Sequence, residues 1–279
     1  MTPDLENKKQ WALAQLRKYD ALAVAFSGGV DSSLLLALAK AALGERVVAL
    51  TARSPVHPPS ETEAARSFAL ELGVEYVAVD SQEMTMDDFR ANSPERCYIC
   101  KKVLFADLKA EAGRRGINTV AHGANCDDLN DFRPGMVAAA EAGIVAPLLD
   151  AGLSKADIRA MSRGMGLSNW NRPAMACLAT RIPYGTTITV KALAMVDDAE
   201  TVLREQGFTQ CRVRHHGDVA RIELPSQDLV RLMAPDVGPG IIAALRAIGF
   251  AHISADLEGY RQGSMNRSLS SEDHVHDSR

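Results

Sequence analysis

Two rhythms of apolar and polar positions follow one another along the first two thirds of the chain. Short continuous apolar runs predict buried strands, and apolar residues spaced three or four positions apart predict helices between them. Strands are expected at 21–26, 47–51, 76–79 and 119–122, with a short fifth ending at 147–150. Helices are expected at 4–17, 31–43, 60–72, 154–165 and from Cys97–Lys102 to about Arg115. Strands separated by helices predict an α/β fold with a doubly wound parallel sheet.

Local signals set the ends of two of these helices. Gly44 directly follows the 31–43 segment and is expected to stop it. Ser60 and Glu63 have the spacing of a capping box, so Ser60 is expected to be the N-cap of its helix.

The pattern changes after residue 168. The stretch 169–188 has little periodicity and is expected to be a catalytic loop and linker. Beyond it we expect a helix at 191–206, a hairpin of 212–216 and 219–223, a helical segment within 229–248 that prolines break, and a strand at 251–257. These elements predict a smaller C-terminal α+β domain that resembles a split βαβ unit. The expected domains are 1–168 and 189–263, with a disordered polar tail at 264–279.

Composition narrows the function classes. The net charge of −4 over 279 residues argues against a strongly basic nucleic-acid surface. No apolar run reaches the roughly 18 residues of a membrane span, and the N-terminal segment has no signal-peptide core, so a cytoplasmic protein is expected. Its five cysteines are then expected to be reduced, catalytic or metal-bound rather than paired in disulfides.

The stretch Ser27-Gly28-Gly29-Val30-Asp31-Ser32-Ser33 joins the first predicted strand to the helix after it. Two glycines allow a sharp turn, and the serine hydroxyls with the free N–H groups of the helix start suit an anion. Asp31 either caps the helix or holds a cation beside that anion. No lysine of the Walker A kind follows Gly29, and G-x-G-x-x-G is absent.

This S-G-G-x-D-S pattern resembles the pyrophosphate loop (PP-loop) of the N-type ATP pyrophosphatases, whose fold is adenine nucleotide α-hydrolase-like. In that superfamily ATP is split between its α and β phosphates. The alternative is a serine-rich turn that caps an ordinary helix.

Cys97 and Cys100 form a single C-x-x-C pair, which is typical of a redox pair, half a zinc site or two ligands of an iron–sulfur cluster. Cys177, in the irregular loop, is the natural third ligand. Inert buried cysteines are the alternative for all three. Cys211 is expected in the core, and Cys126 near the nucleotide loop is ambiguous.

Two further groups of charged residues suit phosphate chemistry. Asp127 and Asp128 follow the fourth predicted strand and either hold Mg²⁺ or cap a helix. Arg212 and Arg214 occupy one face of a predicted strand, where they either bind a phosphate or carboxylate or form a solvated charged face.

With these motifs the chain resembles the LarE family, the ATP-dependent sulfur transferases that build the nickel-pincer cofactor of lactate racemase. The resemblance runs from the Ser27 loop to about Asn266, and its most specific stretches are 176–185 and 213–223. It implies that ATP adenylates a carboxylate of a dicarboxylated pyridinium mononucleotide and that sulfur then displaces AMP to leave a thiocarboxylate.

The resemblance also implies the sulfur source. One branch of the family sacrifices the cysteine that matches Cys177, and this branch lacks the C-x-x-C pair. The other branch holds a [4Fe-4S] cluster on three cysteines, which here would be Cys97, Cys100 and Cys177. Because this chain has the pair, it resembles the cluster branch.

Site residues follow from the same resemblance. ATP would be bound by Ser27, Gly28, Gly29, Val30, Asp31, Ser32, Ala52, Arg53, Gly123 and Asp127 or Asp128, the last two with Mg²⁺. Arg212 and Arg214 would take the substrate phosphate, Arg181 would steady a phosphate or carboxylate at the reacting centre, and Glu200 and Glu223 are weaker candidates for a metal contact. Catalysis would rest on Cys177, Arg181 and Asp31.

The expected partners are the small-molecule mononucleotide and further copies of the chain, without nucleic acid or membrane. Three rival readings stay open. They are a cluster-dependent tRNA thiolase, an ammonia-using adenylating ligase similar to NAD or GMP synthetase, and a nucleotide-sensing module without catalysis.

Overall fold

The computed structural model describes residues 2–130, 134–173 and 176–261. As far as they are described, these residues form two compact units. The first comprises Met1–Met86 and Glu95–Met175, and the second comprises Asp87–Pro94 and Ala176–Arg279. The tail predicted at 264–279 lies outside the described residues. None of the helices in the described ranges combines the length and apolar character that a membrane crossing requires.

The first unit is built on a four-stranded sheet in the order β3-β2-β1-β4, with every pair parallel. This confirms the α/β class and the doubly wound sheet. The strands are β1 Leu22–Ala25, β2 Val47–Arg53, β3 Glu75–Asp80 and β4 Val120–Ala121. The helices are α1 Pro3–Leu16, α2 Val30–Leu43, α3 Pro59–Glu71, α5 Arg96–Arg114, α6 Pro134–Glu141, α7 Pro147–Asp150 and α8 Lys155–Gly164, with short 3₁₀ turns η1 Glu83–Thr85 and η2 Cys126–Asn130.

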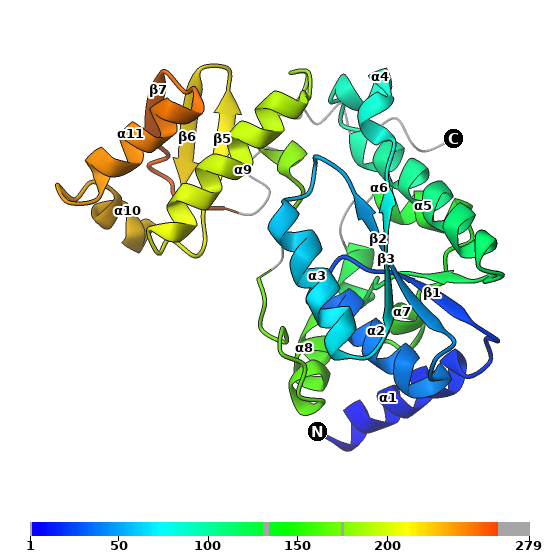
Figure 1. Cartoon of the computed structure of the whole chain (residues 1–279). Helices are drawn as coiled ribbons and strands as arrows, with labels where there is room; N and C mark the ends of the chain where they lie inside the picture. The colour runs from blue at the N-terminus through cyan, green and yellow to red at the C-terminus, as the bar shows by residue number, and fades with distance from the viewer. Residues whose placement is uncertain (1, 131–133, 174–175, 262–279) are drawn as a thin grey trace. The chain divides into compact units, whose positions relative to one another are not determined.

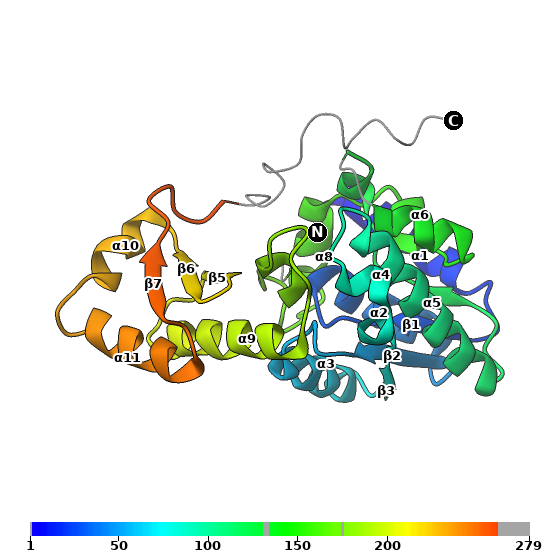
Figure 2. The same cartoon turned by 90° about the horizontal axis from the view of Figure 1, so that it is seen from above.

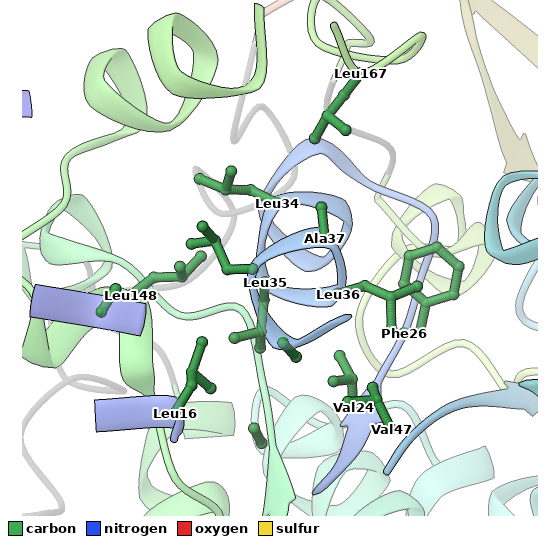
Figure 3. Packing of buried hydrophobic residues seen from close by; sticks show 14 of the residues in the cluster. Leu16, Val24, Phe26, Leu34, Leu35, Leu36, Ala37, Val47, Leu148 and Leu167 are labelled. Atoms are coloured by element: carbon green, nitrogen blue, oxygen red, sulfur yellow. The ribbon is translucent and has the colours of Figure 1, made fainter. Parts of the chain in front are cut away.

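Alternation along the central strands explains why helices cover both faces of this sheet. Leu22 and Val24 belong to the core beneath α1, α2, α3 and α8, whereas Ala23 belongs to the core beneath α5 and α6. Successive strand side chains point to opposite faces, so each face buries its own set. Figure 1 shows the helices on the two sides of the sheet, and Figure 3 shows Leu34, Leu35 and neighbours of α2 at the centre of the first core.

Two local predictions are wrong. The segment 147–150 is the helix α7, and strand pairing at the fifth position is reduced to one bridge between Ala121 and Val145. Pro147 explains this, because proline lacks the N–H that a ladder needs and suits the first turn of a helix. The capping box at Ser60 is also wrong, since α3 begins at Pro59 with Pro58 as N-cap. Gly44 does end α2, as predicted.

The second unit has a three-stranded sheet in the order β5-β6-β7. Its elements are α4 Asp87–Arg90, η3 Leu178–Arg181, α9 Val190–Glu205, β5 Arg212–His216, β6 Val219–Glu223, α10 Ser226–Leu232, α11 Gly238–Ile248 and β7 His252–Ala255. The predicted hairpin is confirmed, and the helical segment breaks into α10 and α11. Helices α9 and α11 lie side by side along the sheet (Figure 2), and their apolar residues share one core with it. Because β7 pairs directly with β6 in parallel, the βαβ unit is not split.

A short excursion of the chain, 87–94, belongs to the second unit. Asn92 is fully buried with φ of 59° and donates from Nδ2 to the carbonyls of Ile182, Pro183 and Thr186 at 2.8–3.3 Å. Asparagine tolerates the left-handed region better than other non-glycine residues. This one amide therefore fastens the segment that follows η3.

Candidate active site

The chain turns sharply between β1 and α2. Gly28 has φ of 72°, and a Cβ there would come within 3.0 Å of the Ala65 Cβ, so only glycine fits. Ser32 Oγ lies 3.1 Å from Ser27 Oγ and accepts from the Ser27 N–H at 3.3 Å. Gly29 is the N-cap of α2, whose first N–H groups lack intrahelical partners. The turn therefore gathers hydroxyl and amide donors at a helix start, which is the geometry of an anion site.

The carboxylate of Asp31 does not cap α2, because Gly29 holds that position, so the capping alternative is wrong. Its Oδ2 forms an ion pair with Nζ of Lys155, the first residue of α8. Its Oδ1 is buried and has no hydrogen-bond partner among the described residues. The cation held beside the loop is thus an ammonium group, which sequence reasoning missed.

The segment after β4 lies against the start of α2. A Cβ on Gly123 would lie 2.8 Å from the backbone nitrogen of Ser32, so only glycine lets the two segments approach. Asp127 Oδ2 accepts from the Lys155 N–H at 2.7 Å, and Asp128 Oδ2 accepts from a backbone N–H at 3.0 Å. Both carboxylates therefore make the backbone contacts of the capping alternative, and a role in holding Mg²⁺ stays a prediction.

Two predicted nucleotide-framing residues lie at the end of β2. Ala52 is partly buried, and Arg53 is exposed and binds Asp80 through two hydrogen bonds of 2.6 and 3.0 Å. This ion pair holds the pKa of the Asp80 carboxyl below its usual value. The ion pair connects the ends of β2 and β3. Contact of Ala52 or Arg53 with a nucleotide stays a prediction.

The segment after α8 reaches back to the Ser27 loop. Asn169 Nδ2 donates to the Gly28 carbonyl at 3.1 Å and to Ser33 Oγ at 2.7 Å. Arg172 Nη1 donates to the same carbonyl at 3.4 Å, and its Nη2 binds Glu61 Oε1 at 2.7 Å. Sequence reasoning placed both residues in an irregular loop and gave neither a role.

All five cysteines are thiols. Cys97 and Cys100 lie at the start of α5, and their spacing puts both on one helix face. Cys177, the residue before η3, belongs to the second unit. Within neither unit do the described residues gather three His, Cys, Asp or Glu side chains around one point. A cluster on these cysteines therefore stays a prediction.

The other two cysteines differ in burial. Cys211 is buried in the core of the second unit, as expected, and burial with the nearby Glu200 charge raises its pKa to about 11. Cys126 is partly buried in η2.

Arg181 is fully buried and its donors are taken by protein groups. Nε and Nη2 bind the buried Glu200 carboxylate at 2.8 and 3.0 Å. Nη1 donates to the carbonyls of Ala176 and Cys177 at 2.7 and 3.0 Å and to Thr180 Oγ1 at 2.9 Å. These bonds hold the turn at Cys177, and the expected contact of Arg181 with a substrate phosphate or carboxylate stays a prediction.

The two arginines of β5 have different partners. Arg214 binds Glu223, which is fully buried, through two bonds of 2.9 and 2.6 Å and donates to the Thr180 carbonyl at 2.8 Å. Arg212 is 8% exposed, donates to the Cys211 carbonyl and lies 5.4 Å from the Tyr260 ring centre. Burial and the charge of Arg181 lower the pKa of Arg212. The solvated alternative is thus wrong for both.

Glu200 and Glu223 were weaker candidates for a metal contact. Each carboxylate is fully buried and lies within ion-pair distance of two arginines in the second unit. Guanidinium groups thus balance the charges that a metal ion would otherwise neutralise.

Comparison with known proteins shows which proteins this chain is similar to. The family model described as NAD synthase matches residues 6–127, which hold the Ser27 loop and β1 to β4. The chain is 37% identical over 266 residues to pyridinium-3,5-bisthiocarboxylic acid mononucleotide synthase of Lactiplantibacillus plantarum, covering 95% of this chain and 96% of that protein. It is 41% identical to an uncharacterized protein of Synechocystis sp., with 95% and 97% coverage.

A match to GMP synthase of Aeropyrum pernix is local. It is 43% identical over 65 residues, which are 23% of this chain and 13% of that enzyme. An alignment that covers so little of that enzyme does not show a shared activity. The full-length match extends through both units, and the chain therefore belongs to the LarE family of pyridinium-3,5-bisthiocarboxylic acid mononucleotide synthases.

Proposed function

We propose that this protein is an ATP-dependent sulfur transferase of nickel-pincer cofactor biosynthesis. It would adenylate a carboxylate of pyridinium-3,5-biscarboxylic acid mononucleotide and convert it to a thiocarboxylate. The observation that carries this proposal is the 37% identity over 95% of the chain to the synthase of L. plantarum. The loop between β1 and α2 supports it, because its donors suit phosphates.

The first step would form an acyl-adenylate. A carboxylate oxygen attacks the α phosphorus of ATP, and the bond from that phosphorus to the bridging oxygen breaks, so pyrophosphate leaves with the electron pair. Ser27, Ser32 and the N–H groups of α2 would bind the phosphates, while Lys155 would add positive charge at the same point. Asp31 fits a Mg²⁺ ion carried by ATP, because its buried Oδ1 has no partner among the described residues.

The second step would replace AMP by sulfur. Sulfur adds to the activated carbonyl carbon, and AMP leaves with the electrons of the C–O bond. The thiols fit a [4Fe-4S] cluster as far as each unit shows, since Cys97 and Cys100 share a helix face and Cys177 is partly exposed. These three residues would hold the cluster, which when bound would supply sulfide at an open iron. The alternative is sacrifice of Cys177 to dehydroalanine.

Arg212 is the residue that we propose for the phosphate of the mononucleotide. It is buried, and no carboxylate lies within ion-pair distance of it in the described part of the second unit. A buried guanidinium with no carboxylate in direct contact gains from an anionic ligand.

The decisive experiment follows both products. The anaerobically purified protein is incubated with MgATP and pyridinium-3,5-biscarboxylic acid mononucleotide, and AMP, pyrophosphate and thiocarboxylate are quantified. Stoichiometric AMP and pyrophosphate with a thiocarboxylate product are expected, and ADP as the product would contradict the proposal. Iron content with a visible spectrum tests the cluster. Loss of one H₂S from Cys177 in iron-free protein, with one product per chain, would favour sacrifice.

A further inference from the structure

We infer that Asn169 and Arg172 are positioning residues for the nucleotide loop, acting through the peptide unit between Gly28 and Gly29. This inference rests on the proposed function only in taking ATP as the ligand of the loop. Neither side chain needs to touch the nucleotide, because both bind the back of the loop.

The Gly28 carbonyl receives two donors from one segment. Asn169 Nδ2 lies 3.1 Å from it and Arg172 Nη1 lies 3.4 Å from it. The C=O and the next N–H of a peptide unit point in opposite directions. Holding this oxygen therefore turns the Gly29 N–H to the other side, where Ser27 Oγ accepts from it at 3.4 Å.

The orientation has an electrostatic consequence for an anion. An N–H facing the loop interior attracts phosphate oxygens, whereas a carbonyl there would repel them. Gly28 has φ of 72°, and glycine populates both signs of φ readily, so its own backbone preference does not hold the peptide. The two donors supply that restraint from outside the loop.

The amide of Asn169 shows which contact determines its orientation. Nδ2 binds the Gly28 carbonyl and the buried Ser33 hydroxyl, while Oδ1 is buried without a hydrogen-bond partner in the described residues. An unpaired buried oxygen is unfavourable. The amide nevertheless keeps the orientation that donates to the loop.

Arg172 is itself held on two sides. Its Nη2 binds Glu61 at 2.7 Å on α3, and its backbone carbonyl accepts from Arg159 Nη2 at 3.2 Å on α8. Two helices of the first unit thus fix the position from which Arg172 reaches Gly28. A guanidinium anchored in this way loses little entropy when it binds the carbonyl.

The test uses binding to the full chain, measured by calorimetry with MgATP and with adenosine, which carries no phosphate. Asn169→Asp keeps the size of the side chain and replaces the donor by an acceptor. We expect its affinity for ATP to fall about ten-fold or more while its affinity for adenosine stays within about two-fold. Arg172→Met should act in the same direction, and Arg172→Lys should restore part of the loss.

Arg163→Ala is the matched control, because Arg163 stacks on Trp170 of the same segment at 5.2 Å without a contact to Gly28. It should leave both affinities unchanged. Unchanged ATP affinity in Asn169→Asp and Arg172→Met, or an equal loss for adenosine, would overturn the inference. Absence of ATP cleavage in the wild-type protein would instead count against the proposed function, since the binding comparison does not depend on turnover.

Discussion

His122, directly after β4, is expected to stay neutral well below neutral pH. Burial lowers its pKa from 6.5 to about 4, the charge of Lys101 acts in the same direction, and Asp128 opposes both. The unfolded chain restores the ordinary value, so it binds this proton more readily than the folded chain does. The contribution of neutral His122 to stability is therefore complete above pH 6.5 and is lost as the pH falls toward 4.

The magnitude follows from the two pKa values of His122. One pKa unit corresponds to about 1.4 kcal/mol, so a difference of about 2.5 units amounts to about 3.4 kcal/mol below pH 4. Between pH 7.5 and pH 5 the same linkage removes about 2 kcal/mol from the free energy of unfolding. The effect is large enough for urea denaturation to resolve.

The assay compares the wild-type protein with His122→Gln in urea at pH 7.5 and pH 5. Both tryptophans, Trp11 and Trp170, lie in the first unit, so their fluorescence reports the unit that contains His122. Other titrating groups are common to both proteins and cancel in the difference. The wild-type protein should lose about 2 kcal/mol more than the variant. Equal losses, or an NMR titration of His122 near pH 6.5, would refute the reasoning.

Three further outcomes are expected. Gly123→Ala should lower the free energy of unfolding by about 1–3 kcal/mol and weaken ATP binding, because its Cβ would lie 2.8 Å from the backbone of α2. Urea denaturation measures the first effect and calorimetry the second, and wild-type values in both would contradict this prediction. Lys155→Met should slow ATP–pyrophosphate exchange about ten-fold or more by leaving Asp31 without its cation, and an unchanged rate would exclude that role. Glu200→Gln should lower the free energy of unfolding by about 3–5 kcal/mol, because Arg181 keeps a buried charge; a loss under about 1 kcal/mol would show that the pair is not needed.

The strands and helices of the first unit could be predicted because each buries its own local pattern. The run at 21–26 alternates between two helix-covered faces, so its residues are apolar without interruption, and β1 appears there. The strand predicted to end at 147–150 is a helix that begins at Pro147. The short apolar run around Pro147 gives no period that separates strand from helix. The loop at Ser27 was visible for a different reason, since its glycines and serines act within a few residues of one another.

The partners of the loop could not be predicted, because they come from far along the chain. Lys155 and Asp31 are 124 positions apart, and Asn169 and Gly28 are 141 apart. No local pattern records such a contact. What the sequence did show was the helix start at Ser154, whose capping box with Asp157 is present in the structure. The helix was predictable, whereas the residue that it delivers to the loop required the fold.

For the arginines of β5, the predicted hairpin already indicated a partner within the same sheet. Its register places Arg212 opposite Glu223, with Arg214 diagonal to the same carboxylate. Diagonal neighbours are within reach of long side chains, so the register predicts that one of the two arginines pairs with Glu223. The structure shows that Arg214 does so. Because Glu223 pairs with Arg214 and Arg221, the described second unit leaves Arg212 with no carboxylate within ion-pair distance. This strengthens the case for Arg212 as a phosphate ligand, whereas the same role for Arg214 stays a prediction.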